Sequence, residues 1–362
     1  MNPDQSALPE LSALELAALA SAALKETQIR GYRPPLVTNA DGQTLTVTDT
    51  DGTAWLVWAP SKPVSEESFA RHVEVLRLLS EAANSGRLPF TVSLPEGVAT
   101  RGGTGVVLAH PHPGGASLKE DALVGRSLLA SSLGGALGSL HELDAASFAH
   151  ATRAKATPTQ TREAYRKLVE KHSTSIPSRL RRRWMAAIDD DALWAFDATP
   201  LHGNLSVDSV YASSEGAVLG LCHFTSAAVG DPAQDLAWLL YHADDDFLEA
   251  FQAAYSARRT SADLHILTRA QLVSELATLR WFARGKRADD RPWIEAGLKA
   301  LRDLDAEIGD HWLVAPKPDV VDIRFTVEEE PLLKLKGRAD KAGDAPDPSE
   351  DITGATEVIN LQ

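Results

Sequence analysis

Apolar residues in the first third of the chain follow helical spacing in some stretches and strand-like spacing in others. The expected elements are a helix over 11–24, strands at 45–50 and 54–59, a second helix over 65–83 and a strand at 105–109. Asp51-Gly52 separates the first two strands and predicts a hairpin with a type I′ turn. Helix, hairpin, helix and strand together predict a small α+β lobe.

From about residue 119 the spacing of apolar residues is mostly helical. The expected helices cover residues 123–142, 161–171, 177–196, 232–241, 247–258, 263–284 and 291–308. A β-like stretch at 207–224 interrupts them, with two short strands around a turn. The predicted organisation is an N-terminal lobe over 1–109, a Pro- and Gly-rich linker at 110–118, a helical C-terminal lobe over 119–313, an extension over 314–336 and a tail over 337–362.

The tail differs from the rest of the chain in composition. Residues 337–362 hold six acidic residues, two basic residues and no aromatic residue. Such a composition predicts an acidic disordered tail, although the more apolar ending TEVINLQ leaves a docking peptide open. A basic run at 179–183 is interpreted as a solvated helix face, with a docking site for an acidic partner or for the tail as the alternative.

The charge balance narrows the range of partners. The chain has 36 Lys and Arg against 50 Asp and Glu, a formal charge of −14. Nucleic acids and anionic membranes require a concentrated basic face, so neither is expected as a partner. The single cysteine excludes an intramolecular disulfide and a cysteine metal cluster. The N-terminus lacks the order of a signal peptide and no apolar window reaches 18 residues, so a cytoplasmic protein is expected.

The most specific pattern lies between residues 201 and 240. It reads LHGNLSVDSVYASSEGAVLGLCHFTSAAVGDPAQDLAWLL. This segment resembles the aminoglycoside and macrolide phosphotransferase family, especially its macrolide 2′-phosphotransferase branch. These are small-molecule kinases with a bilobal protein-kinase-like fold. WLVWAP at 55–60 and HPHPGG at 110–115 resemble the family's phosphate-contacting strand and inter-lobe linker. The resemblance implies that Asp235 holds the catalytic loop through hydrogen bonds to its backbone.

The resemblance places the catalytic carboxylate of the family at Asn204. Phosphoryl transfer needs a group there that orients or deprotonates the attacking hydroxyl. An amide has the shape of a carboxylate but does not accept a proton near pH 7. Loss of a general base lowers the rate by roughly 10²–10⁴. Asn204 is therefore expected to be inactive as a base.

The metal positions of the family also differ in this sequence. The resemblance places them at Ser209 and His223. A serine hydroxyl can bind Mg²⁺, but this ion prefers carboxylate, carbonyl and water oxygens to imidazole. Asp208 is an alternative ligand if the loop shifts by one residue, and otherwise caps a turn or faces solvent. His223 is otherwise a hydrogen-bonded structural histidine.

The cofactor-binding positions in the N-terminal part show the same departure. Trp58 stands where the family has the Lys or Arg that pairs with nucleotide phosphates, and His72 stands where it has the partner Glu. An indole offers one neutral donor and a large apolar ring in place of a cation. Trp58 either fills the cleft or packs into the lobe core.

These departures lead to two functional hypotheses. The first is a pseudokinase that keeps the phosphotransferase fold and acts by binding a protein partner or a small ligand, with no cofactor expected. The alternative is an active macrolide or aminoglycoside O-phosphotransferase that uses ATP or GTP with Mg²⁺ in a rearranged site containing Asp208 and Ser209. Whether the chain is an enzyme is left open between them.

Overall fold

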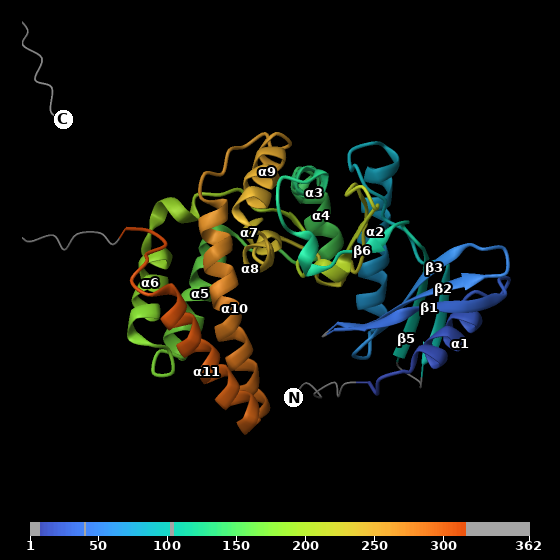
Figure 1. The fold of residues 1–362 in the computed structure, drawn as a ribbon, viewed down its shortest axis with the longest axis horizontal. Helices are drawn as coiled ribbons and strands as arrows, with labels where there is room; N and C mark the ends of the chain where they lie inside the picture. The colour runs from blue at the N-terminus through green and yellow to red at the C-terminus, as the bar shows by residue number, and fades with distance from the viewer. Residues whose placement is uncertain (1–7, 40, 102–104, 316–362) are drawn as a thin grey trace, which may run out of the picture. The chain divides into compact units, whose positions relative to one another are not determined.

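The computed structural model describes residues 8–39, 41–101 and 105–315 (Figure 1). The N-terminal elements are α1 (Ala13–Ala23), β1 (Ile29–Thr38), β2 (Gly42–Asp49), β3 (Ala54–Pro60), α2 (Glu66–Asn84), β4 (Gly97–Arg101) and β5 (Gly105–Pro111). The elements that follow are β6 (Ala116–Ser117), η1 (Glu120–Ala122), α3 (Leu128–His141), α4 (Ala145–Thr152), α5 (Pro158–Lys171), α6 (Ser178–Asp189) and η2 (Asp191–Trp194). The next are β7 (Thr199–Leu201), η3 (Val207–Ser209), β8 (Val210–Ala212), β9 (Val218–Leu221), η4 (Phe224–Ser226) and β10 (Ala228–Gly230). The last are α7 (Ala233–Leu236), α8 (Leu239–His242), α9 (Asp245–Ser256), α10 (Ile266–Ala288) and α11 (Arg291–Ile308).

Strands β1 to β5 form one antiparallel sheet in the order β1-β2-β3-β5-β4. Trp58 of β3 pairs in register with Thr44 of β2 on one side and with Leu108 of β5 on the other. Directly paired residues project from the same face of a sheet. Thr44, Trp58 and Leu108 therefore form a row across one face.

Helix α1 covers the opposite face of this sheet. Leu16 and Ala20 of α1 are fully buried, and they share a hydrophobic core with Val57 and Val107 of β3 and β5. Side chains along a strand alternate between faces, so Val57 and Trp58 project in opposite directions. The packing of α1 on one face thus leaves the Trp58 face for contacts with the rest of the chain.

The turn between β2 and β3 differs from the expected type I′ turn. The amide of Gly52 donates to the carbonyl of Asp49 at 3.2 Å, and Gly52 has a φ of 87°. A type I′ turn needs positive φ at both central residues, and Asp51 does not have it. The expectation of a two-residue type I′ turn is therefore wrong. The loop is longer, and a glycine in the left-handed region follows an ordinary turn.

Helix α2 joins the sheet region to the helical part of the chain. Its N-cap is Ser65, whose hydroxyl accepts a hydrogen bond from the amide of Ser68 at 3.2 Å. Val75, Leu76 and Leu79 are buried in a hydrophobic core that also contains residues of α3, α4 and α9. The apolar face of α2 is thus fixed against the helices that follow it in the sequence.

The C-terminal helices enclose two hydrophobic cores. In the first, α3 and α9 pack so closely that a Cβ at Gly134 would lie 2.3 Å from the carbonyl oxygen of Phe251. The second core joins α5, α6, α10 and α11 around side chains such as Trp184 and Leu276, which are fully buried. None of the described helices is long and apolar enough to cross a membrane.

The expected elements agree with the structure in most cases. The helices predicted at 11–24, 65–83 and 291–308 are α1, α2 and α11, and the β-like stretch at 207–224 contains the antiparallel strands β8 and β9. The helix predicted at 232–241 consists of the two short helices α7 and α8. Strand β1, helix α4 and the pair β7–β10 were not expected.

The predicted boundaries stay predictions. The linker at 110–118 was expected to start after the strand, whereas β5 continues to Pro111. The structure describes only residues 314 and 315 of the predicted extension at 314–336. The predicted disordered tail at 337–362 lies outside the described residues.

The basic run at 179–183 is not one solvated face. Arg183 is buried and pairs with Glu275 at 2.6 Å, and Arg179 pairs with Asp305 at 3.0 Å. The expectation of a continuous exposed face is therefore wrong for Arg179 and Arg183, because each has a carboxylate partner on another helix. Only residues 181 and 182 of the run are exposed.

Candidate functional site

A loop that follows β7 is held in place by one buried carboxylate. Asp235 of α7 accepts hydrogen bonds from the amides of His202 at 2.7 Å and Gly203 at 2.8 Å. The expected role of Asp235 in holding this loop is therefore confirmed. Gly203 has a φ of 85°, and a Cβ there would lie 2.0 Å from the carbonyl oxygen of Ser226. Only glycine fits this position without a shift of the backbone.

The side chain of Asp235 lies in a fully buried polar network. Its Oδ2 lies 3.2 Å from Nε2 of His141, whose Nδ1 contacts the hydroxyl of Tyr255 at 2.9 Å. Burial opposes ionisation of Asp235, but the hydrogen bonds from His141 and from the amide of Gly203 lower its pKa. The loop is thus held by an ionised carboxylate.

Asn204, the residue at the expected position of the catalytic base, contacts the N-terminal sheet. Its Nδ2 donates a hydrogen bond to the carboxylate of Asp41. Asp41 lies between β1 and β2, immediately before the first residue of β2. Asp41 was not expected at this position from the sequence, although Asp41-Gly42 is a turn signal like the Asp51-Gly52 of the next hairpin. The contact brings the turn between β1 and β2 onto the catalytic-loop position.

His223 makes a second direct contact between the same two regions. Its Nε2 lies 3.1 Å from Oγ1 of Thr44 on β2, and its ring centroid lies 6.2 Å from that of Trp58. The backbone of His223 has a φ of 67°, in the left-handed region that non-glycine residues seldom adopt. The row of Thr44 and Trp58 on the sheet therefore faces the position expected for the principal metal ligand.

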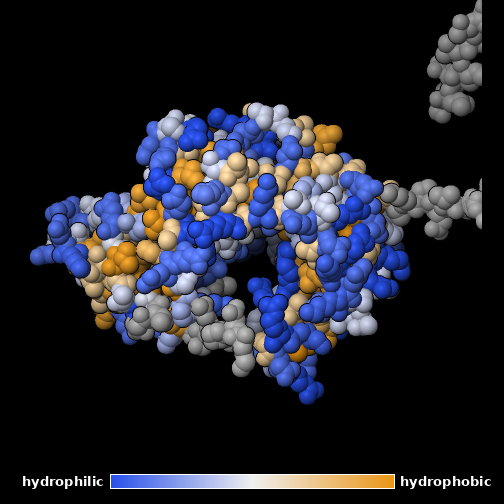
Figure 2. All heavy atoms as spheres, turned by 180° about the vertical axis from the view of Figure 1, so that it is seen from behind, coloured by the Kyte–Doolittle hydropathy of each residue, from blue (hydrophilic) through white to orange (hydrophobic). Residues whose placement is uncertain are grey.

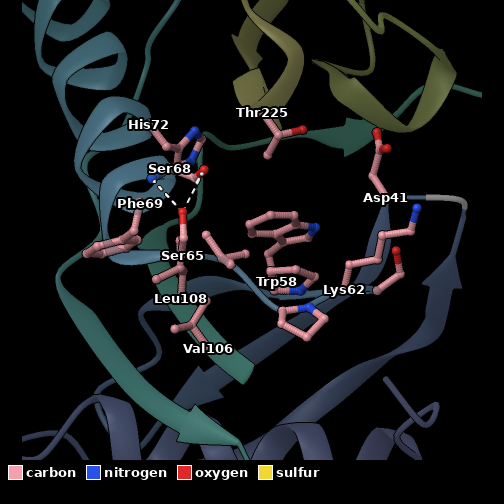
Figure 3. A pocket seen from close by; sticks show the side chains of 14 residues that line it. Asp41, Trp58, Lys62, Ser65, Ser68, Phe69, His72, Val106, Leu108 and Thr225 are labelled. Carbon is pink, nitrogen blue, oxygen red and sulfur yellow. Dashed lines mark hydrogen bonds between the residues drawn. The ribbon is translucent and has the colours of Figure 1, made fainter. Parts of the chain in front are cut away.

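His72 of α2 lies on the other side of Trp58. The centroids of the two rings are 6.1 Å apart, and Nδ1 of His72 is buried without a hydrogen-bond partner among the described residues. The structure thus brings the expected residues Trp58, His72 and His223 together, because each imidazole packs near the indole of Trp58. Figure 3 shows Trp58 and His72 of this group.

Ser209 and Asp208 lie in η3, beside the segment that carries His223. The carbonyl of Ser209 accepts a hydrogen bond from the amide of Cys222 at 2.9 Å. The side chain of Ser209 is buried, and its hydroxyl lies 3.5 Å from the hydroxyl of Ser206. Asp208 is half-buried. The loop and this segment are joined again where Nε2 of His202 donates to the carbonyl of Cys222 at 2.7 Å.

The expected metal positions do not fit Mg²⁺. Ser209 and His223 supply a hydroxyl and an imidazole, whereas this ion prefers carboxylate and water oxygens. Across residues 8–39, 41–101 and 105–315, no three side chains of His, Cys, Asp or Glu are grouped so that they could hold a metal ion. Asp208 is therefore not part of such a group of three within the described residues.

A cavity of about 300 Å³ lies next to Trp58, between α2 and the strands β3 and β5. In Figure 3 the Trp58 ring lies between His72 on one side and Asp41 and Lys62 on the other. Most of the remaining lining is apolar and includes Phe69. The cavity offers a small, mainly apolar space and one lysine at its edge.

The histidines around Trp58 predict an acid-sensitive fold. Burial, and then the neighbouring His110, lower the pKa of His72 to about 4. Burial, and then His202, His110 and His72, lower the pKa of His223 to about 3. The unfolded chain takes up protons at these residues near pH 6.5, but the folded chain does not. We expect the free energy of unfolding to fall as the pH drops from about 6.5 to about 4, by up to about 1.4 kcal/mol per pH unit for each histidine.

Urea denaturation of the wild type and of the variant His72→Gln/His223→Asn between pH 7 and pH 4.5 measures this effect. The variant should show a shallower decrease of the free energy of unfolding with falling pH. The exposed His150 provides the matched control, because His150→Asn should keep the wild-type slope. Equal slopes for the wild type and the double variant would contradict the prediction.

Comparison with protein families and solved structures gives a consistent result. A model of the phosphotransferase enzyme family matches residues 34–267, more than half of the chain. The uncharacterized protein YcbJ of Bacillus subtilis (strain 168) is 35% identical over 65 residues, which cover 18% of this chain and 21% of that protein. The chain thus spans about a fifth of the length of this curated relative in the match.

Solved phosphotransferases resemble the chain over most of its length. The apoenzyme of macrolide 2′-phosphotransferase MphH from Brachybacterium faecium has 23% identity and a TM-score of 0.65, over 79% of this chain and 97% of that one. The GDP complex of aminoglycoside 2′-phosphotransferase-IIIa has 17% identity and a TM-score of 0.65, over 83% and 100%. At such identities the likeness establishes the bilobal kinase-like α+β fold and no more.

Proposed function

We propose that the chain, which belongs to the phosphotransferase enzyme family, is a pseudokinase. It keeps the fold of the family but has lost phosphoryl transfer. It acts by binding a small ligand or a protein partner. The observation that carries this proposal is the direct contact of the sheet with the catalytic positions. Asp41 contacts Asn204, and Thr44 and Trp58 contact His223.

Space at these positions supports the proposal. A transferring phosphate and its metal ion must fit between the sheet and the catalytic loop. Here the indole of Trp58 and the hydrogen bond between Thr44 and His223 occupy that region. A nucleotide that placed its transferring phosphate and metal ion at His223 would have to displace these contacts, although the cavity of about 300 Å³ lies beside the indole.

Electrostatics give a second, separate argument. A nucleoside triphosphate requires cations, yet the residues in contact at the catalytic positions are an aspartate, an amide, neutral imidazoles and an indole, and the cavity beside them has a single lysine, Lys62, in its lining. The carboxylate of Asp41 would repel a phosphate at this position. The family's general base corresponds to Asn204, which cannot accept a proton near pH 7.

The direct test is phosphoryl transfer by the unmodified protein. We expect no turnover of radiolabelled ATP or GTP with Mg²⁺ against a panel of macrolides and aminoglycosides, because base, metal ligand and phosphate cation are all replaced. Restoring Asn204→Asp alone should also fail, because residues that act as one unit are not rescued singly. An active macrolide phosphotransferase assayed in parallel shows that the conditions support turnover.

A thermal melt with Mg²⁺ and ATP gives an independent measurement. Ligand at about 1,000 times its dissociation constant would raise the free energy of unfolding by about 4 kcal/mol, and we expect no such rise. The fourfold variant Trp58→Arg/Asn204→Asp/Ser209→Asn/His223→Asp tests whether binding returns. Its aspartate at 223 suits the left-handed backbone there. Turnover by the wild type that is lost in Asp208→Ala would overturn the proposal and establish an active phosphotransferase with a rearranged site.

A further inference from the structure

Asn204 also lines an open cleft of about 520 Å³. This cleft lies between the segment of α7 and α8 and the helix α10. This volume lies within the range of small-molecule sites. One stripe of α10 lines it at spacings of three and four residues, through Val273, Ala277, Arg280 and Arg284. On the face shown in Figure 2, hydrophilic residues border the hollow near the centre.

The charge of the cleft is opposite to that of the chain. The chain carries a formal charge of −14, yet the residues that line the cleft include Arg280 and Arg284 and no carboxylate. Other arginines of the C-terminal helices, such as Arg183 and Arg269, have carboxylate partners within hydrogen-bond distance. Within the described part of the chain, neither cleft arginine forms a salt bridge.

The structure orients Arg280 without neutralising it. One Nη donates to the carbonyl of Val273 at 3.0 Å, and the guanidinium lies 5.8 Å from the ring centroid of Tyr165. Arg284 lies four residues further along the same helix and is exposed. Like charges at this spacing repel each other, and an anion bound between them would remove the repulsion.

Two aromatic residues of the lining are suited to the apolar part of a ligand. Trp238 is fixed by a hydrogen bond from its Nε1 to the carbonyl of Asp235 at 2.9 Å, and Tyr241 is 76% exposed. Aromatic rings of this kind provide flat surfaces on which a ring or an alkyl chain can pack. Ala237 and Ala277 line the same cleft with small side chains.

We propose that this cleft binds a small organic anion, a carboxylate or a phosphate ester with an aromatic or apolar body. The anionic group contacts Arg280 and Arg284, because guanidinium groups form paired hydrogen bonds with carboxylates and phosphates. The body packs against Trp238 and Tyr241. This inference gives a chemical class to the ligand of the proposed function, and it disfavours polycationic antibiotics, for which the lining offers no carboxylate.

Three naphthalene probes with different charges test the proposal by isothermal titration calorimetry on the full chain at pH 7. They are 2-naphthoate, 2-naphthyl phosphate and 2-naphthylmethylammonium. The two anions should bind about tenfold more tightly than the cation, which corresponds to one strong charge-assisted contact. The stronger of the two anions identifies a carboxylate or a phosphate as the preferred group.

Arg284→Glu should weaken anion binding about tenfold or more and should strengthen binding of the ammonium probe. Arg302→Glu makes the same charge change at an exposed arginine of α11 outside the cleft, and its dissociation constants should stay within about twofold of the wild type. Equal binding of cation and anions, no binding of either anion at millimolar concentration, or equal effects of the two substitutions would overturn the proposal. The titrations contain neither nucleotide nor metal, so their failure would leave the loss of phosphoryl transfer untouched, and turnover would leave the anion site untouched.

Discussion

An Arg269→Ala variant is expected to lose about 3–5 kcal/mol of the free energy of unfolding, because it leaves a buried carboxylate without its counter-charge. The side chains of Arg269 and Asp231 are 1% and 0% exposed, and Nη2 of Arg269 donates to Oδ1 of Asp231 at 3.0 Å. Arg269 also contacts Asp263 and donates to the carbonyl of Leu193 at 3.1 Å. Asp231 is fully buried, so removal of Arg269 leaves its carboxylate without this counter-charge in the interior.

Urea denaturation of the wild type and the variant measures the loss. Arg291→Ala is the matched control, because Arg291 forms an ion pair with Glu295 at 3.0 Å in which both side chains are largely exposed. Exposed pairs contribute about 0–1 kcal/mol, so this control should stay within that range. A loss below 1 kcal/mol for Arg269→Ala would show that the ion pair does not carry the stability of this region.

A Glu275→Ala variant should lose a similar amount, about 3–5 kcal/mol, for a related reason. Glu275 is 1% exposed and accepts two hydrogen bonds from Arg183, at 2.6 and 3.0 Å, and one from Nε1 of Trp184 at 2.8 Å. Its removal leaves one buried charge and one buried N–H donor without this partner. The loss should affect the core of α5, α6, α10 and α11, in which Trp184 is fully buried.

The double variant Arg183→Met/Glu275→Leu distinguishes an unpaired charge from a general packing defect. Replacing both partners of a buried ion pair by apolar side chains is often close to neutral, so the double variant should be more stable than Glu275→Ala. Thermal melts of the three proteins at pH 7 give this comparison. A double variant that is less stable than the single one would assign the effect to packing.

Residue patterns predicted the long helices well and the short or irregular strands poorly. Helices such as α2 and α11 carry apolar residues at helical spacing over many turns, and their bounds agree within a few residues. β1 has the sequence IRGYRPPLVT, and its glycine and two prolines are unusual in a strand, so the pattern did not predict one. Its register with β2 is also irregular. β7 and β10 have three residues each, too few to show alternation.

The candidate site was predicted in part, for a physical reason. The resemblance identified Trp58, His72, Asn204, Ser209 and His223 by their places in a motif, and the structure brings Trp58, His72 and His223 into contact. Their functional roles stay predictions. A motif does not show which side chains from elsewhere meet these positions, so Asp41 and Thr44 were missed. These two contacts depend on how the sheet packs against the loop.

The hydrogen bond that Asn204 donates to Asp41 and the hydrogen bond between Thr44 and His223 restrict the motion of the two lobes. Two-lobed enzymes capture and release substrate by changing the angle between their lobes. In this chain two hydrogen bonds join the lobes, so the angle between the lobes is already fixed in the free protein. A partner that touches both halves would meet them already aligned and would not lose the entropy of freezing a hinge. A small molecule would diffuse into an open cleft. Its association rate would not be limited by opening and closing of the lobes.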